Sequence, residues 1–439
     1  MSESLDQFTN NVHRNNYYNV VWRVVGIILS FLFTRYNIAY LGASLYGLWL
    51  TIASITSWAN LGNLGIGNGL RNELAKAIAQ EDAEKQRNLI WTAVSLLSKL
   101  SMVIFVILAI VCEVLFATDV IDSSLRVPMY ITNTFFCISF ILGISRSVAL
   151  SYQLSWLTTF SQTLVIIFNL SAVLLLMVTG VTPNLVIYAI LMGVGTLLGN
   201  VLIIFNLRKK MNEYLHGEFR GHYTPQHRNS ILNVGLQFFV LQICCIILYS
   251  TDNIIINKLF DSVQVTKYSV IHSVYYTGEG LFAIFLVSLW SAVTFAAEKG
   301  EFAWVKKEVN NLLKIWGLYS VGVIGVSVLF NPIVNIWLGD GAMYYEPSLV
   351  AMFAIYTILT QFGSIYVNVT NGLGRIKLQM ICSVIGAVLN IPLSIILATT
   401  CGLGLKGIIL ATLLCCFGSW VLVPIDIISL LKRENKHKI

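Results

Sequence analysis

The recurrence of apolar stretches about as long as a bilayer is thick limits the fold of this chain most strongly. A transmembrane helix needs about 20 predominantly apolar residues to cross the hydrocarbon core. Of the 439 residues, 56% are hydrophobic and only 11% are charged, against about 25% charged residues in soluble domains. This composition excludes a soluble globular enzyme, a disordered chain and a disulfide scaffold. Open sheet edges are not tolerated in lipid, so the apolar stretches are expected to be helices.

Hydropathy and helix breakers delimit twelve such segments. They are Tyr18–Tyr40, Leu45–Leu64, Leu89–Cys112, Pro128–Ala149, Thr158–Val178, Leu185–Asn206, Ile231–Asn253, Ser269–Ala296, Leu312–Ile333, Ser348–Asn371, Leu378–Ala398 and Gly407–Leu430.

The basic residues predict the orientation of these helices. With the N-terminus inside, twenty of the 28 Lys and Arg residues fall in cytoplasmic loops and termini, and four fall in outer loops. Cytoplasmic loops carry an excess of Lys and Arg. We therefore expect a multi-pass protein with both termini in the cytoplasm, whose first helix serves as an uncleaved signal anchor.

A polar segment divides the chain into two halves. It covers 207–230, between a predicted six-helix bundle at 1–206 and a second at 231–439. Similar charged connectors follow the second helix of each half, at 72–87 and 298–311. Because six is even, both halves enter the membrane in the same direction, which is typical of transporters that alternate access between parallel repeats. The expected fold is an all-α polytopic membrane protein with about 12 transmembrane helices in two parallel six-helix bundles around a central cavity.

Four basic residues fall inside predicted helices, and they are the main candidates for substrate binding. They are Arg23, Arg35, Lys99 and Arg146, all in the N-terminal half. A basic residue at the centre of a spanning helix costs about 2.5–3.5 kcal/mol, so such residues usually face a bundle interior or an aqueous cavity. This surplus of positive charge predicts an anionic substrate. The alternative is that the long side chains reach the headgroups and have no binding role. Arg23 and Arg35 lie about 120° apart around an ideal helix.

Two acidic residues inside the C-terminal half are candidates for ion coupling. Glu279 lies between two glycines near the middle of the eighth helix, and Asp252 lies near the outer end of the seventh. A buried carboxylate can exchange a proton or bind a cation. The alternative is a structural ion pair or hydrogen bond that holds the helices together.

Other motifs predict no metal site and no cofactor. The eight cysteines form no CxxC pair, and most lie in apolar segments, where free Cys behaves as a small hydrophobe. Residues 402–407 match GxGxxG by letter but lie in a turn between helices, whereas a dinucleotide fold requires a preceding strand. His216, His222 and His227 lie in the polar segment at a spacing that makes a metal site improbable, so we expect a solvated linker.

Three groups of motifs resemble a known family. Tyr46–Trp49 and Leu64–Asn72 are similar to the early part of bacterial O-antigen and polysaccharide-unit flippases, the Wzx-like members of the polysaccharide transporter family. Gly235–Phe239 and Thr251–Ile256 resemble the opening of their second half, and Asn371–Gln379 resembles a late cytoplasmic turn. The resemblance covers nearly the whole chain and places it in the multidrug/oligosaccharidyl-lipid/polysaccharide exporter superfamily.

The resemblance implies a flippase of the bacterial inner membrane that moves an undecaprenyl-diphosphate-linked oligosaccharide to the periplasmic leaflet. The diphosphate would need cationic partners, which Arg23, Lys99, Arg35 and Arg146 could supply. Related lipid II flippases have a basic cavity with an arginine in the first helix. In this chain, Arg23 is the matching type of residue. Their fourteen-helix pattern departs from the twelve helices predicted here, which favours an O-unit over a peptidoglycan precursor. The expected partners are H⁺ or Na⁺ and other O-antigen assembly proteins, and not nucleic acid.

Two further classes of function stay open at this point. A multidrug exporter of the same superfamily would depend mainly on Glu279 and Asp252. A membrane O-unit polymerase would be an enzyme, but that chemistry usually needs a larger outer loop than Glu113–Val127. We therefore expect a transporter and not an enzyme. A structural scaffold would not explain the costly charges inside the helices.

Overall fold

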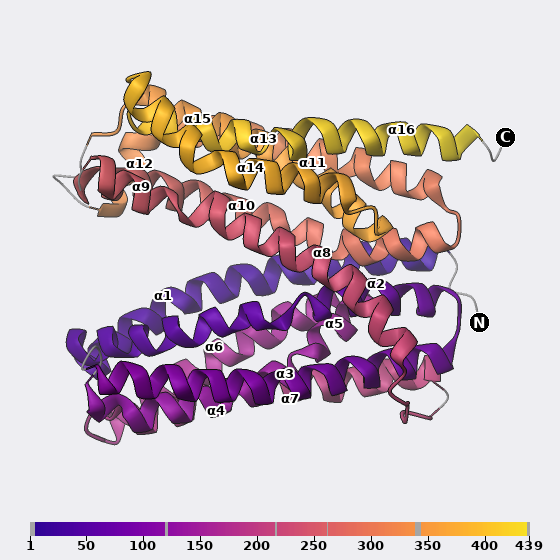
Figure 1. Cartoon of the computed structure of the whole chain (residues 1–439), viewed down its shortest axis with the longest axis horizontal. Helices are drawn as coiled ribbons and strands as arrows, with labels where there is room; N and C mark the ends of the chain where they lie inside the picture. The colour runs from indigo at the N-terminus through magenta and orange to yellow at the C-terminus, as the bar shows by residue number, and fades with distance from the viewer. Residues whose placement is uncertain (1–4, 119–121, 216, 261, 339–343, 437–439) are drawn as a thin grey trace. The chain divides into compact units, whose positions relative to one another are not determined.

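The computed structural model is helical throughout the parts of the chain that it describes (Figure 1). It describes residues 5–118, 122–215, 217–260, 262–338 and 344–436, and these ranges contain no strand. The chain forms two compact units, Met1–Leu236 and Gln237–Ile439, and the boundary between them falls inside one helix, α8.

The first unit contains seven α-helices, the beginning of α8 and two short 3₁₀ turns. Its elements are α1 (Leu5–Trp58), η1 (Ala59–Asn63), α2 (Ile66–Ala79), α3 (Ala83–Ala117), η2 (Ser123–Leu125), α4 (Arg126–Leu142), α5 (Ile144–Ser151), α6 (Ser155–Val178), α7 (Leu185–Leu215) and α8 (Pro225–Ser250).

The second unit contains the rest of α8, eight further α-helices and two π-helical turns. These are α9 (Asp252–Leu259), α10 (Ser262–Glu298), α11 (Phe302–Val328), α12 (Phe330–Leu338), α13 (Pro347–Leu373), α14 (Lys377–Ile395), η3 (Ile396–Thr400), α15 (Leu405–Cys415), η4 (Gly418–Leu422) and α16 (Val423–Lys436).

Most of the predicted spans coincide with observed helices. Ten helices among the described residues are long and apolar enough to cross a membrane, and α15 with η4 and α16 forms an eleventh candidate, bent by 44°. The predicted helix Leu45–Leu64 is not among them. It follows a kink at Gly42, whose φ of 72° is non-helical, and it ends in the 3₁₀ turn η1. The division into halves at 1–206 and 231–439 stays a prediction. Helix α7 extends into the start of the predicted linker at 207–230, and α8 begins before its end.

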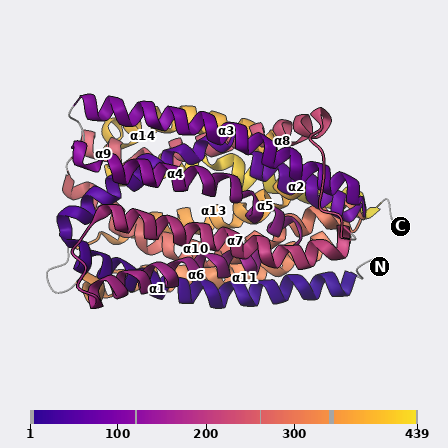
Figure 2. The same cartoon turned by 90° about the horizontal axis from the view of Figure 1, so that it is seen from below.

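A seam of polar side chains joins α1 to α6, which lie side by side in both views (Figure 2). The Asn19 side chain donates to Ser155 Oγ at 2.9 Å and accepts from Thr159 Oγ1 at 2.8 Å. One turn further, Thr163 Oγ1 donates to the carbonyl oxygen of Trp22 at 3.0 Å. Small polar residues let helices approach closely and bond across the contact. The seam leaves the opposite face of α1 exposed.

Glycines allow α2 to cross α8 with the two backbones in contact. A β-carbon on Gly65 would collide with the carbonyl oxygen of Gly235, and one on Gly69 would collide with that of Ile231. Gly65 also has a φ of 69° at the N-cap of α2, in the left-handed region that glycine adopts without steric cost. The glycine run of the sequence therefore forms a tight helix crossing.

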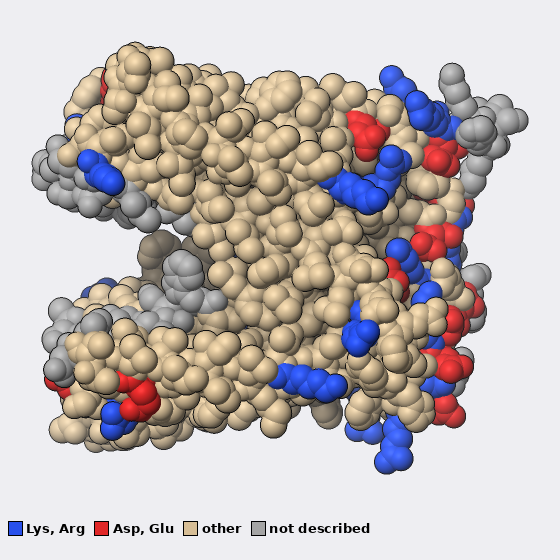
Figure 3. Space-filling model, viewed as in Figure 1, with Lys and Arg blue, Asp and Glu red and all other residues tan. Residues whose placement is uncertain are grey.

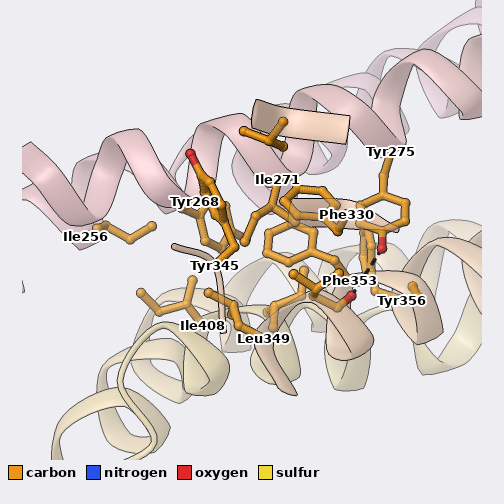
Figure 4. Packing of buried hydrophobic residues seen from close by; sticks show 14 of the residues in the cluster. Ile256, Tyr268, Ile271, Tyr275, Phe330, Tyr345, Leu349, Phe353, Tyr356 and Ile408 are labelled. Carbon is orange, nitrogen blue, oxygen red and sulfur yellow. Dashed lines mark hydrogen bonds between the residues drawn. The ribbon is translucent and has the colours of Figure 1, made fainter. Parts of the chain in front are cut away.

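In the second unit, α13 is the central helix, because α10, α11, α15 and α16 all pack against it. Figure 4 shows the aromatic part of the buried core, where Tyr275, Phe330 and Phe353 lie with their rings close together. The rings of Tyr275 and Phe353 are stacked, with centroids 6.2 Å apart. This core contains residues of both α9 and α15.

Charged side chains gather near one end of the helices in each unit (Figure 3). In the first unit this is the end where α2 turns into α3, and in the second it is the end where α16 finishes. A broad band with few charges covers most of the remaining visible face of each unit, as expected of helices that stand in lipid. The assignment of the charged end to the cytoplasm stays a prediction.

We predict that Gly65→Ala lowers the melting temperature of the purified protein by several degrees. The left-handed backbone costs an L-residue about 1–2 kcal/mol, and the added methyl group meets the carbonyl of Gly235. Gly317→Ala is the matched control, because nothing lies within 4 Å of a β-carbon there. Equal melting temperatures for the two variants, measured by thermal unfolding in detergent, would contradict the tight crossing.

Candidate functional site

The two arginines of α1 lie on exposed parts of that helix. Arg23 and Arg35 are both exposed, and no hydrogen bond or ion pair to either is found among the described residues. Arg35 lies near the exposed apolar residues Phe31 and Ile38, which are 69% and 44% exposed. Arg35 thus lies on an apolar surface of the protein. This placement fits the alternative in which its long side chain reaches the lipid headgroups and has no binding role.

Lys99 lies beside the segment that connects α7 to α8. Its Nζ is 5.1 Å from the centroid of the Tyr223 ring, within the range of a cation–π contact. Met102, Val103 and Val106, on the same face of α3, are all more than half exposed. Lys99 therefore has an aromatic partner on an apolar surface, and its role as a phosphate ligand stays a prediction.

The connecting segment 217–224 is fixed to α3 by further contacts. The backbone N–H of His222 donates to Asn88 Oδ1 at 2.8 Å, and Trp91 Nε1 donates to the carbonyl oxygen of Phe219 at 2.9 Å. An ion pair of 2.6 Å joins Arg87 to Glu218 at the end of this contact. This part of the predicted linker contacts α3 through these bonds, while Glu218, Arg220 and His222 are exposed. The solvated linker stays a prediction.

Arg146 is the most enclosed of the four predicted basic residues. It lies in the short helix α5, is half-buried, and its Nε is buried without a hydrogen-bond partner among the described residues. Burying a charged donor without a partner is costly, so such groups are expected to be paired. Arg146 is therefore the strongest of the four candidates, and its role in anion binding stays a prediction.

Arg71 lies on the helix that packs against α5, and sequence analysis did not single it out. It is only 5% exposed, and its carbonyl oxygen accepts a hydrogen bond from Ser151 Oγ at 3.1 Å. Gly67, one turn earlier, packs against Ser147, the neighbour of Arg146. Arg71 was counted with the cytoplasmic loop residues because it follows the predicted second span. Its burial accompanies the packing of α2 against α5, which the sequence pattern does not specify.

No hydrogen bond or ion pair within the described residues joins any two of Arg23, Arg35, Lys99 and Arg146. They lie on α1, α3 and α5, so the structure does not bring the four together as one cluster by direct contact.

The two predicted carboxylates of the second unit each accept a hydrogen bond from a hydroxyl group. Glu279 in α10 is half-buried and accepts from Thr357 Oγ1 of α13 at 3.2 Å. Asp252, at the start of α9, is buried and its Oδ2 accepts from the Tyr268 hydroxyl at 2.5 Å. No basic residue within 4 Å of either is found in the described chain. The structural ion pair considered from the sequence is therefore not found among the described residues, whereas hydrogen bonds between helices, the other form of that alternative, are present.

Comparison with known proteins identifies relatives along nearly the whole chain. No family model matches the sequence. The chain is 22% identical over 441 aligned residues to a protein of Yersinia pseudotuberculosis named "Putative O-antigen export protein", and 95% of each sequence is covered. This similarity confirms the resemblance to O-antigen exporters predicted from the motifs.

Solved structures show the class of fold. A MATE structure in the straight conformation superposes with a TM-score of 0.80 at 16% identity, covering 96% of each chain. An outward-facing multidrug resistance MATE transporter of the MOP superfamily gives 0.77 at 15% identity, and a MOP superfamily transporter from Pyrococcus furiosus gives 0.76 at 15%, each again covering 96% of both chains. The protein is a polytopic membrane protein with the fold of the MATE transporters.

We predict that Asn88→Ala releases the connecting segment from α3. The substitution removes the acceptor of the His222 backbone N–H, so trypsin should cleave at the flanking Arg220 and Arg228 faster in open membrane preparations. Asn206→Ala is the control, because that exposed side chain donates only within its own helix. Unchanged cleavage in Asn88→Ala would show that this contact does not hold the segment.

Proposed function

We propose that the protein is a flippase for undecaprenyl-diphosphate-linked O-antigen units, which it moves from the cytoplasmic to the periplasmic leaflet of the inner membrane. The observation that carries the proposal is the similarity to a named O-antigen export protein over 95% of both chains. The transporter fold supports it, because a lipid-linked sugar must be moved as a whole by alternating access.

The headgroup of such a substrate carries a diphosphate, and its recognition needs positive charge. Guanidinium groups bind phosphate oxygens through two parallel hydrogen bonds. Arg146 offers a buried guanidinium nitrogen without a partner, and Arg71 is buried on the adjacent helix. We therefore assign Arg146 the leading role in phosphate binding, with Arg23, Arg35 and Lys99 as further cationic contacts along the path.

Ion coupling is assigned to the second unit. Asp252 and Glu279 are enclosed carboxylates with hydroxyl partners, and neither has a basic group within 4 Å among the described residues. Buried ionisable groups within membrane helices mark ion pathways, because their burial is costly unless function requires it. The exchange of H⁺ or Na⁺ at these groups would drive the conformational cycle, and other O-antigen assembly proteins would supply and remove the substrate.

We expect Arg146→Ala to abolish surface O-antigen in a strain whose chromosomal copy is deleted and replaced by a plasmid copy. Loss of the guanidinium removes the proposed phosphate contact, and Arg146→Lys should restore only part of the export because Lys binds as a point charge. Arg126→Ala is the control, since that exposed arginine pairs with Glu113. The readout is O-antigen on the cell surface, normalised to the amount of protein in the membrane.

Normal O-antigen in Arg146→Ala would remove Arg146 from the mechanism. In the same assay, Lys99→Ala should lose export while Tyr223→Ala retains it, if Lys99 contacts the substrate. Equal losses in both variants would show that Lys99 acts only by holding Tyr223.

The second candidate is a multidrug exporter driven by cations, and the two carboxylates favour it. That function predicts resistance to cationic drugs, which should disappear in Glu279→Gln because the charged group that accepts from Thr357 is lost. We expect instead that expression of the wild-type protein leaves drug susceptibility unchanged. Efflux of a fluorescent cation from cells, compared with the empty vector, is the measurement, and efflux lost in Glu279→Gln would favour the multidrug function.

A further inference from the structure

The connecting segment 217–224 places an aromatic ring beside a basic side chain at two points. Near its start, the guanidinium carbon of Arg208 in α7 lies 5.6 Å from the centroid of the Phe219 ring. Near its end, Lys99 Nζ of α3 lies 5.1 Å from the centroid of the Tyr223 ring. Both distances are within the range of a cation–π contact. One short segment therefore gathers cations from two helices that are far apart in the sequence.

Neither of these cations is neutralised by an acid in the part of the chain that the structure describes. Lys99 and Arg208 are both exposed, and no carboxylate there lies within 4 Å of either. Glu218 is the only acidic residue of the segment, and it forms a 2.6 Å ion pair with Arg87. The charges of Lys99 and Arg208 thus stay available to an anion.

The two basic side chains reach toward a common level. Side chains of an α-helix tilt toward its N-terminus. Helix α3 begins at the charged end of the first unit, and α7 finishes there. The tilt therefore directs Lys99 toward the charged end and Arg208 away from it. Phe219 and Tyr223 are four residues apart, so their Cα atoms are at most about 14 Å apart. Both cations consequently lie within one small area of the surface.

Exposed apolar side chains continue from each cation toward the middle of its helix. Met102 and Val103, next to Lys99 on α3, are 75% and 54% exposed, and Phe205, one turn before Arg208 on α7, is 78% exposed. Both helices are long and apolar enough to cross a membrane, so these side chains face hydrocarbon. A molecule that fits this surface has a negatively charged group joined to alkyl chains.

The aromatic side chains place the connecting segment at the level of lipid headgroups. Trp91 of α3 and Tyr223 are 46% and 39% exposed, and Trp and Tyr are enriched where a membrane meets water. Trp91 also fixes the segment, because its Nε1 donates to the carbonyl oxygen of Phe219 at 2.9 Å. The cations held over Phe219 and Tyr223 therefore stand where a lipid phosphate lies.

We propose that Lys99, Arg208, Phe219 and Tyr223 form a binding site for an anionic phospholipid. The phosphate contacts the two cations, and the acyl chains lie on the exposed apolar side chains of α3 and α7. Basic pockets beside transmembrane helices bind acidic headgroups in this way. A zwitterionic phospholipid fits less well, because its own cation faces the two unpaired cations. The site has a ligand of its own and does not depend on the proposed function.

The experiment titrates the purified, delipidated full-length protein with phospholipid in mixed micelles at physiological ionic strength, without substrate. A ligand that binds the folded state raises the melting temperature. We expect phosphatidylglycerol to raise it to a plateau, and phosphatidylcholine with the same acyl chains to have no such effect. Native mass spectrometry should show phosphatidylglycerol retained by the protein.

Substitution of either cation should weaken this binding. Lys99→Gln and Arg208→Gln should each raise the midpoint of the phosphatidylglycerol titration about fivefold, and the double variant about twenty-five-fold. Lys99→Arg, which keeps the charge, should restore most of the binding. Both side chains are exposed, so we expect the variants to fold.

Lys210→Gln is the matched control. Lys210 lies on the same helix as Arg208 and also has an aromatic neighbour, with its Nζ 5.2 Å from the centroid of the Tyr214 ring. It differs in forming a 2.8 Å ion pair with Glu213. Its replacement changes the net charge as much as Lys99→Gln does, but the midpoint should stay at the wild-type value.

Three outcomes would overturn the site. Equal stabilisation by phosphatidylcholine would show that the surface only contacts headgroups without selecting them, and equal shifts in Lys99→Gln and Lys210→Gln would show that net charge alone attracts the lipid. Stabilisation by undecaprenyl phosphate but not by phosphatidylglycerol would assign the surface to a prenyl phosphate. A dimer in detergent that dissociates in Lys99→Gln would identify a second copy of the chain as the occupant and would also refute the proposal.

Discussion

The lack of water in the hydrocarbon core of a bilayer is the constraint on which the rest of this structure depends. Every polar group at that depth must find its partner inside the protein, which excludes open sheets and favours helices. The seam between α1 and α6 follows the same rule, because Asn19, Thr159 and Thr163 bond to each other's helices and not to solvent. Several buried side-chain atoms in both units have no partner among the described residues, and Arg146 Nε and Asp252 Oδ1 are the ones that belong to charged groups.

The charged groups among these exceptions differ in sign between the two units. In the first unit the charged group is Arg146, whose Nε is buried without a partner among the described residues, and the buried Arg71 lies on the adjacent helix. In the second unit it is Asp252, whose Oδ2 accepts from the Tyr268 hydroxyl. The proposed function uses this difference, because it assigns the anionic headgroup to the first unit and the coupling ion to the second.

Much of the fold was predictable because span detection depends only on local composition. Ten of the twelve expected segments coincide with apolar helices, and a bent pair accounts for an eleventh. The segment Leu45–Leu64 was harder to predict from the sequence, because the kink at Gly42 and the turn η1 shorten its helix. The candidate site was less predictable. Lys99 was selected for its depth along α3, but its contact with Tyr223 depends on the path of a segment far away in the chain.

The amino-acid sequence alone determined the class of this protein, because hydropathy, charge distribution and short motifs are properties of neighbouring residues. It also identified Arg146, Asp252 and Glu279 as charged groups inside apolar segments. Only the tertiary structure decided which of these groups have partners and which neutral residues stand beside them. Arg71 follows a predicted span, so no local pattern marks it as a buried residue. It is only 5% exposed on α2, which packs against α5, and this contact joins segments far apart in the chain.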